Sequence, residues 1–272
     1  MSTAQSAGRS AEAAARRAAD SPALDRLARI GLACRGVLYA LIGVLAIQIA
    51  MGSGDREADK GGAITAVADL PFGSVILWVM VVGFAALAIW QASEALFSHH
   101  KTLDRVESAA RTVVYGLIVF TLLSVLLDGR AASEDQKSQD VTGKLLDLPG
   151  GEFIVGAIGL GIIALGVYWI RRGVTKKFRE ELNTGQMSPQ TRSMMDRLGM
   201  AGYVARGVIA GLAGILVVQA AITHDPDKAG GIDQALRSFA DTPVGPWLLV
   251  AVALGLLLFA GYCFGESRWR RT

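Results

Sequence analysis

Six long apolar segments, separated by polar stretches, dominate the pattern of the chain. They cover residues 30–51, 72–97, 109–127, 153–170, 199–222 and 244–264. Each approaches the roughly 20 apolar residues that an α-helix needs to cross the hydrocarbon core of a bilayer. The strands of a membrane barrel would be shorter and would alternate in polarity, which these segments do not. The pattern therefore predicts an all-α integral membrane protein with six transmembrane helices.

A motif in the first segment returns twice further along the chain. GLACRGVLYALIGVLAIQIAM around Arg35 is matched by AARTVVYGLIVFTLLSVLL around Arg111 and by GYVARGVIAGLAGILVVQAAI around Arg206. Each copy is followed by a polar loop and then by a second apolar segment. The chain is therefore predicted to be three repeats of a two-helix unit.

The three polar loops inside the repeats share a form as well. Each has a Gly-led turn, a short amphipathic piece, and then Pro71, Pro149 or Pro243 shortly before a glycine. A proline in the first turn of a helix costs no hydrogen bond, so these prolines predict where each second helix begins.

The repeats set the predicted division of the chain. It runs as a flexible tail (1–26), repeat one (27–97), repeat two (98–173), a basic loop (174–197), repeat three (198–269) and a short end (270–272). Because each unit crosses twice, all three enter the membrane in the same sense and are parallel repeats. We expect a pseudo-threefold bundle of six helices, with a sequential row as the other possible packing. Gly207 and Gly211, four residues apart, would let helix backbones approach closely.

Basic residues are distributed unequally between the two sides of the predicted membrane. Seventeen of the 27 Lys and Arg residues lie in the two tails and the two loops between repeats, against seven in the three loops inside repeats, which carry 14 Asp and Glu. Because loops rich in Lys and Arg stay on the cytoplasmic side, both termini are expected there. With a mean hydropathy of +0.40, the protein is expected to be a multi-pass protein of the plasma membrane.

The arginine motifs carry a family resemblance. ACRGVLYALIG and VARGVIAGLAG fit the pattern of an Arg followed by Gly, while AARTVVYGLIV has Thr112 in place of Gly. On these residues the chain resembles the bacterial domain-of-unknown-function 1206 family, over nearly its whole length beyond the amino tail. The resemblance implies three tandem two-helix membrane repeats, and it brings no established reaction or ligand.

The three repeat arginines, Arg35, Arg111 and Arg206, are the sharpest functional hint. Each lies about two turns inside its helix, where a bare charge is unfavourable by roughly 2–3 kcal/mol at the deepest positions. One interpretation is a basic ring that binds an anion, a lipid headgroup or a carboxylate. The other is structural, either snorkelling to the interface or ion pairing, for which Glu94 and Glu266 occupy matching positions on the second helices. The residues favour ion pairing.

Repeat two departs from this arrangement. It has Arg172 where the other repeats have glutamates, and Glu107 lies one turn before Arg111. Arg111 is therefore expected to be the least compensated of the three repeat arginines. If any of them binds a ligand, Arg111 is the first candidate.

A second set of polar residues falls at one repeat position: Gln48, Ser124 and Gln219. Polar side chains at one level of a threefold bundle can line a cavity. They can equally hydrogen-bond across helices, at around 0.6 kcal/mol each, and this is the favoured interpretation.

The segment 171–197, which contains the basic loop, is the longest predicted cytoplasmic segment. Its sequence KKFREEL is expected to extend the preceding helix. Its cations suit anionic lipid headgroups or an acidic partner, although fixing the orientation of the protein also explains them.

Nothing in the sequence resembles a catalytic set. There is no GxxxxGK[ST] loop and no pair of membrane histidines for haem, so we expect no enzymatic activity, no cofactor, no metal site and no nucleic-acid partner. The expected partners are the lipid bilayer, anionic lipids within it, and a membrane protein. The favoured function is a non-enzymatic assembly, accessory or lipid-binding module. The alternative is a small transporter or channel for an anionic solute that uses the repeat arginines.

Overall fold

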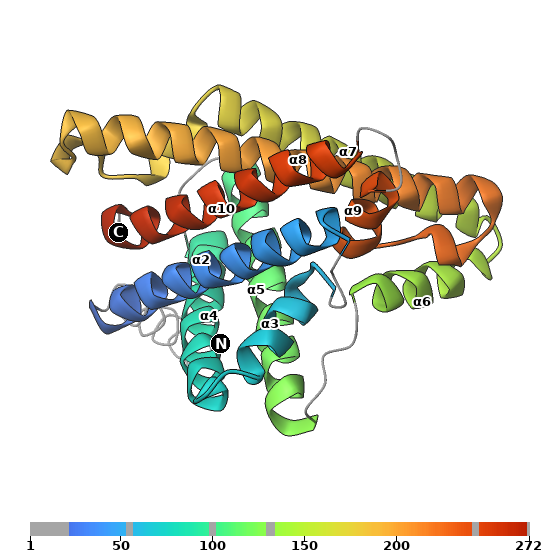
Figure 1. Cartoon of the computed structure of the whole chain (residues 1–272), viewed down its shortest axis with the longest axis horizontal. Helices are drawn as coiled ribbons and strands as arrows, with labels where there is room; N and C mark the ends of the chain where they lie inside the picture. Colours follow the sequence, from blue (N-terminus) through green and yellow to red (C-terminus); the bar gives the residue numbers. More distant parts are fainter. Residues whose placement is uncertain (1–21, 53–56, 98–101, 129–133, 241–244, 271–272) are drawn as a thin grey trace, which may run out of the picture.

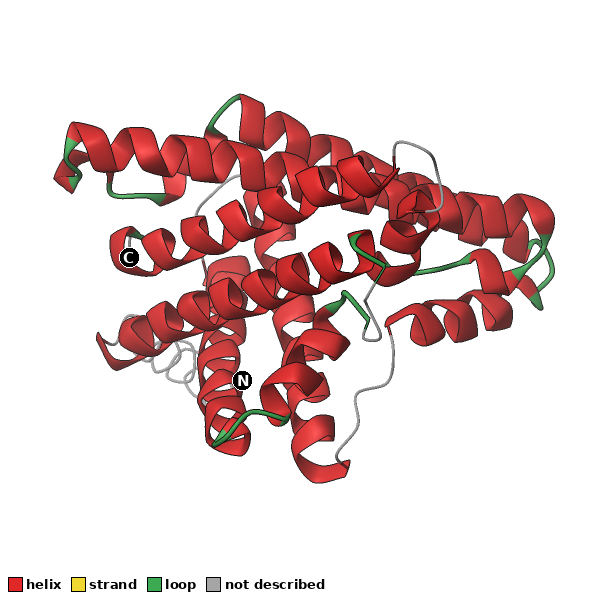
Figure 2. Ribbon diagram, viewed as in Figure 1, coloured by secondary structure: helices red, strands yellow, loops and turns green. Residues whose placement is uncertain are grey.

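The computed structural model describes residues 22–52, 57–97, 102–128, 134–240 and 245–270, and within these ranges the chain is helical apart from short loops (Figure 2). Six helices are long and apolar enough to cross a membrane. They are α2 (Pro22–Ala50), α4 (Gly73–Phe97), α5 (Thr102–Asp128), α7 (Gly151–Val174), α8 (Pro189–Thr223) and α10 (Gly245–Trp269). The predicted all-α fold with six membrane spans is confirmed, and the protein is a multi-pass membrane protein.

Each repeat also contains a short helix between its two long ones. These are α3 (Lys60–Ala68), α6 (Glu134–Leu146) and α9 (Ile232–Ala240). They correspond to the amphipathic pieces predicted in the loops. One repeat is therefore a long helix, a short helix and a second long helix, and this unit occurs three times.

The second long helices of repeats one and two begin after the same turn. Its sequence is Asp-Leu-Pro-Phe-Gly in repeat one and Asp-Leu-Pro-Gly-Gly in repeat two. Phe72 and Gly150 occupy equivalent places and both have left-handed backbones, with φ of 63° and 75°. A side chain on Gly73 or Gly151, which follow, would overlap a backbone carbonyl of the preceding short helix. The geometry therefore requires glycine at the start of these helices.

The long helices pack in the order α5, α4, α2, α10, α8 and α7. In the described part of the chain, α5 and α7 do not pack along one another, so the series of neighbours stays open within repeat two. Figure 1 shows α4 and α5 running across the direction of the other four long helices. The other neighbouring pairs are those expected of a ring of repeats, but the six helices do not share a single axis.

Glycine pairs set the close approaches between helices. A Cβ on Gly31 of α2 would overlap the backbone of Gly83 in α4, and Gly166 of α7 meets the backbone of Gly207 and Gly211 in α8. The close approach predicted at Gly207 and Gly211 is therefore present. Without side chains at these positions, backbones can touch and their neighbours can interlock.

The loop after α7 departs from the prediction. The segment KKFREEL does not extend the helix: α7 ends at Val174, Lys176 has a left-handed backbone, and Lys177–Glu181 forms a separate 3-10 turn, η1. A second 3-10 turn, η2 (Thr184–Gln186), follows in the same loop, and a third, η3 (Pro226–Lys228), lies between α8 and α9. The reversal buries Phe178 completely against Tyr203, with ring centroids 5.6 Å apart. A continuous helix would have carried this large apolar ring away from the core.

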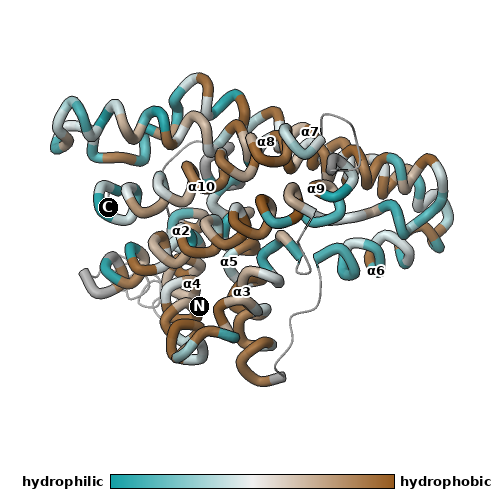
Figure 3. Tube along the Cα trace, in the orientation of Figure 1, coloured by the Kyte–Doolittle hydropathy of each residue, from teal (hydrophilic) through white to brown (hydrophobic). Residues whose placement is uncertain are grey.

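Hydrophilic residues gather at opposite ends of the long axis, around the start of α8 and the carboxyl terminus at one end and around α6 and α9 at the other (Figure 3). The spans of α7 and α5 are the least buried, with 17% and 22% of their positions buried against 50% for α2. Repeat two therefore presents the largest apolar surface to the bilayer.

Candidate functional site

Arg35 of α2 is held by groups from two other repeats. Its guanidinium donates to the Glu266 carboxylate of α10 and, at 2.9 Å, to the Tyr115 hydroxyl of α5. The Glu266 side chain is 1% exposed and also accepts from Arg270 at 2.5 Å. Of the arrangements expected for Arg35, the structure has the ion pair with Glu266, which joins repeat one to repeat three.

Arg111 of α5 is the most fully paired of the three repeat arginines. It donates to Glu107 and, at 2.8 Å, to Glu181 of η1. Arg172 of α7 donates to the same two carboxylates, at 2.7 Å and 2.5 Å. The expectation that Arg111 is the least compensated is therefore wrong. The reason is the folded-back loop, because it delivers Glu181 from a segment that the sequence placed in a helix extension.

The charges around Glu181 determine its ionisation. Burial raises the pKa of its carboxyl, but the guanidinium groups of Arg111, Arg270 and Arg172 outweigh burial and hold the pKa well below its usual range. Glu181 is thus ionised and pairs with α5 and α7 together. The buried Phe178 three residues earlier is the one sequence signal for this fold-back, since a large apolar residue among charges indicates a segment that packs inward.

Arg206 of α8 is stabilised in a different way. Its guanidinium carbon lies 4.2 Å from the ring centroid of Trp169, 4.6 Å from Phe259, 5.2 Å from Tyr39 and 5.8 Å from Tyr203. These distances are typical of cation–π interactions. Within the described residues Arg206 makes no hydrogen bond or ion pair. The aromatic neighbours were not predicted from the sequence, because they come from four different helices.

Glu94 does not form the ion pair with a repeat arginine that was expected. No described residue forms an ion pair with it, unlike Glu266 at the equivalent position. Its helix α4 packs against α5, whose repeat arginine, Arg111, is already held by Glu107 and Glu181. The repeat position is therefore equivalent in sequence but not in its surroundings.

In the candidate polar layer, Ser124 bonds within its own helix. The Ser124 hydroxyl donates to the Phe120 carbonyl of its own helix at 3.0 Å. Gln48 and Gln219 are both exposed on their helices. The hydroxyl of Ser124 therefore stabilises α5 itself rather than a junction between helices.

A second polar network, which we call the acidic cap, joins the short helices α3, α6 and α9. Asp59 is fully buried and accepts from the backbone N–H groups of Gly62, at 2.7 Å, and Glu134, at 3.0 Å. Lys60 pairs with Glu134 at 2.7 Å. Burial and the nearby Glu134 carboxylate raise the pKa of Asp59 to about 6. This part of the cap joins repeat one to repeat two.

Repeat three enters the acidic cap through backbone contacts. Asp233 accepts from the N–H of Ala58 at 2.8 Å and from Arg237 at 2.7 Å. Asp135 accepts from the N–H of Gly231 at 2.6 Å, and burial raises the pKa of its carboxyl. Every pair of repeats is thus connected through a carboxylate.

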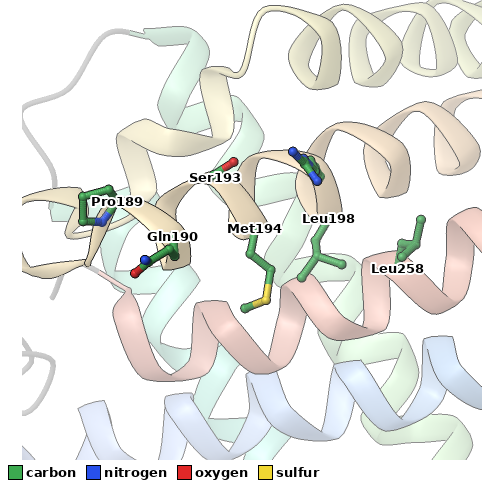
Figure 4. A pocket seen from close by; sticks show the side chains of 7 residues that line it. Pro189, Gln190, Ser193, Met194, Leu198 and Leu258 are labelled. Atoms are coloured by element: carbon green, nitrogen blue, oxygen red, sulfur yellow. The ribbon is translucent and has the colours of Figure 1, made fainter.

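A shallow surface groove of about 600 Å³ runs between the start of α8 and the middle of α10 (Figure 4). Its lining combines polar side chains with apolar ones. They are Pro189, Gln190, Ser193, Met194, Arg197, Leu198 and Leu258. The groove is therefore amphipathic, which suits a molecule that has a polar head and an apolar body.

Comparison with known proteins gives matches to an uncharacterised family. The model described as Domain of Unknown Function (DUF1206) matches three times, over residues 30–98, 106–176 and 201–270. The chain is 29% identical over 249 residues, 89% of each chain, to "Uncharacterized protein YxxB" of Bacillus subtilis (strain 168). No solved structure matches the chain. The three matches coincide with the three structural repeats.

Proposed function

The chain belongs to the DUF1206 family of membrane proteins, and we propose that it is a non-enzymatic module of the plasma membrane that binds anionic phospholipid and serves in assembly or as an accessory subunit. The observation that carries this proposal is the use of the arginines as ties between helices. Arg35 is bonded to Glu266, and Arg111 and Arg172 share Glu107 and Glu181. Arginines that are paired in this way stabilise one fixed arrangement of the helices.

The energetics of buried pairs support a fixed body. Breaking a buried pair by removing one partner costs about 3–5 kcal/mol, because the remaining charge is left without compensation. A transporter that alternates between two states by parting α2 from α10 would have to separate Arg35 from Glu266. The pair therefore opposes that motion.

The amphipathic groove supports phospholipid as the partner. By the distribution of Lys and Arg, the start of α8 lies on the cytoplasmic side. There Arg197 can attract an anionic headgroup, at about 1 kcal/mol per basic residue near the surface. Leu198 and Leu258 line the same groove and suit an acyl chain. The match of charge and apolar lining favours an anionic phospholipid over a neutral one.

Native mass spectrometry of the protein, released from vesicles of phosphatidylglycerol mixed with phosphatidylcholine, tests this binding. We expect wild type to retain phosphatidylglycerol preferentially and Arg197→Gln to lose that preference. Arg192→Gln is the matched control, because Arg192 is exposed on the same helix and does not line the groove. Equal retention of both lipids by wild type would overturn the lipid proposal.

Transport of an anionic solute is the competing function, and the observation that favours it is that Arg206 pairs with no carboxylate among the described residues. Vesicles loaded with a fluorescent organic anion decide between the two. If the protein is a non-enzymatic module, inserting it into the vesicles should leave the rate at which the anion is released unchanged. Release that is accelerated by wild type and abolished by Arg206→Gln would replace the module with a transporter or channel.

A further inference from the structure

A set of buried and half-buried side chains holds an excess of positive charge. Three glutamates, one of them in η1, and five arginines are linked by ion pairs or by aromatic rings that two arginines share. We call this set the arginine cluster. Its members are Arg35, Arg111, Arg172, Arg206, Arg270, Glu107, Glu181 and Glu266. Five cations against three anions leave a net charge of +2. An uncompensated charge in apolar surroundings is costly.

The same region holds buried hydrogen-bond donors that have no acceptor. In the described structure the Nε of Arg172 and the hydroxyl of Tyr262 are buried and unpartnered. These two residues are 7% and 0% exposed. Buried polar atoms in proteins are nearly always paired, so each exception needs an explanation. Arg206 adds a guanidinium that contacts aromatic rings and has no hydrogen-bond acceptor among the described residues.

Shared rings bring these donors to one place. The guanidinium carbons of Arg172 and Arg206 lie 5.6 Å and 5.8 Å from the ring centroid of Tyr203. The ring of Tyr262 lies 5.8 Å from that same ring. Phe259 lies between Arg206 and Arg35 in the same way, at 4.6 Å and 5.6 Å. The unpartnered donors therefore surround one aromatic core.

Aromatic rings compensate a guanidinium only in part. They attract its positive charge, but its five N–H donors require acceptors such as carboxylate or phosphate oxygens. Arg35, at the equivalent position, has such an acceptor in Glu266, while Arg206 has none in the described chain. An anion with several oxygens would supply such acceptors at Arg206.

We propose that the arginine cluster binds one phosphate group, with Arg206 as its main ligand and the Tyr262 hydroxyl and Arg172 Nε as further donors. Inorganic phosphate or a phosphate monoester carries about −1.5 to −2 charges at pH 7, which matches the excess of +2. Arginine binds phosphate strongly through parallel N–H bonds. The group is either inorganic phosphate or the monoester headgroup of a phospholipid such as phosphatidic acid. This site goes beyond the proposed function, whose lipid groove lies at Arg197.

Inorganic phosphate is the first probe. We expect phosphate to raise the melting temperature of the purified protein more than chloride does at equal ionic strength, because a ligand of the folded state stabilises it. Arg206→Gln should weaken phosphate binding at least about tenfold, which corresponds to one lost charge-assisted bond. Arg206→Lys keeps the charge without the planar fork and should retain part of the binding. Arg192→Gln removes an exposed arginine of the same helix that lines neither the groove nor the cluster, and this variant should bind phosphate like wild type.

Tyr262→Phe separates ligand binding from a structural role. It removes only a buried hydroxyl that has no partner among the described residues, so without phosphate the melting temperature should stay unchanged or rise. With phosphate present, the affinity should fall about threefold to tenfold. Binding that is unchanged in both Tyr262→Phe and Arg206→Gln, or no effect of phosphate beyond that of chloride on wild type carrying no bound phospholipid, would overturn the site.

Native mass spectrometry identifies the source of the phosphate. A bound mass of inorganic phosphate, or of a single phospholipid, that is lost in Arg206→Gln and kept in Arg197→Gln supports the site and names its ligand. A bound phospholipid lost in Arg197→Gln and kept in Arg206→Gln assigns that lipid to the surface groove instead and counts against the lipid form of the site. The two proposals can therefore fail separately.

Discussion

The arginine cluster and the acidic cap both connect the three repeats, but they do so with opposite chemistry. In the cluster, guanidinium groups bond directly to carboxylates from other elements, as Arg35 does to Glu266. In the cap, carboxylates such as Asp59 and Asp233 mainly accept from backbone N–H groups. The cluster has an excess of cations, and the cap stands among acidic loops. The cluster therefore depends on charge balance, and the cap on the protonation of its acids.

Glu266→Gln should have the largest effect, because one carboxylate compensates both Arg35 and Arg270. We expect a loss of about 3–5 kcal/mol in the free energy of unfolding, as for other buried pairs from which one partner is removed. Denaturant unfolding in detergent measures it. Glu180→Gln, on an exposed neighbour of Glu181, is the control and should be within about 0.5 kcal/mol of wild type.

The double variant Arg35→Gln with Glu266→Gln makes this test specific. Since the two side chains compensate each other, removing both should cost less than the sum of the single losses. Additive losses would mean that the two groups stabilise the fold independently and that their ion pair does not hold repeats one and three together.

Asp233→Ala should cost less than the loss of Glu266, although it also removes a buried carboxylate from a junction of repeats. It leaves the N–H of Ala58 without its acceptor, and a buried unpaired donor costs about 1–3 kcal/mol. Amide hydrogen exchange at Ala58 reports the local loosening. Asp140→Ala, on an exposed position of α6, should leave the exchange of Ala58 unchanged, and a similar change there would refute the role of Asp233.

The pH dependence of stability should distinguish the cap from the cluster. The pKa of Asp59 is about 6 in the folded protein, above about 3.9 for an unfolded chain. The folded state therefore binds the proton more tightly, so this stabilisation is complete below about pH 4 and is lost as pH rises through 6. Melting temperatures should fall from pH 5 to pH 7.5.

Asp59→Asn identifies the group responsible. It should remove most of this pH dependence, which corresponds to about 1–2 kcal/mol, at the expense of the bond from the Glu134 amide. Glu266→Gln, although less stable throughout, should keep the wild-type slope with pH. A steeper slope in Asp59→Asn than in wild type would contradict the assignment.

The repeat pattern predicted the fold well and the sites only in part. Six apolar segments, a recurring arginine and the prolines of the loops were enough for the spans, the repeats and the starts of the second helices in repeats one and two, because these depend on local composition and spacing. Pro243, which predicts the third start, lies outside the described residues. Arg35 and Glu266 could be paired from their depth in the helices. Glu181 could not, since it reaches Arg111 only when the loop after α7 folds back over Phe178.

Repeat symmetry also misled where neighbours differ. Glu94, Arg172 and Glu266 occupy one position in the three repeats. In the described structure Arg172 and Glu266 each form ion pairs with residues of other elements, whereas Glu94 forms none. A repeat fixes where a side chain lies on its own helix. Which helix lies opposite depends on packing across repeats. At Arg206 that packing adds Tyr39 of α2 and Trp169 of α7 to the two rings that repeat three itself supplies.

Ser124→Ala should have the smallest effect, and it tests the candidate polar layer against both networks. The Ser124 hydroxyl bonds the Phe120 carbonyl within α5, a contact that competes with the backbone ladder and contributes little to helix stability. We expect a change within about 0.5 kcal/mol in unfolding free energy, and unchanged phosphate binding. A loss above about 1 kcal/mol, comparable to Asp233→Ala, would mean that Ser124 joins helices after all. The polar layer would then be a third junction of repeats, between the arginine cluster and the acidic cap.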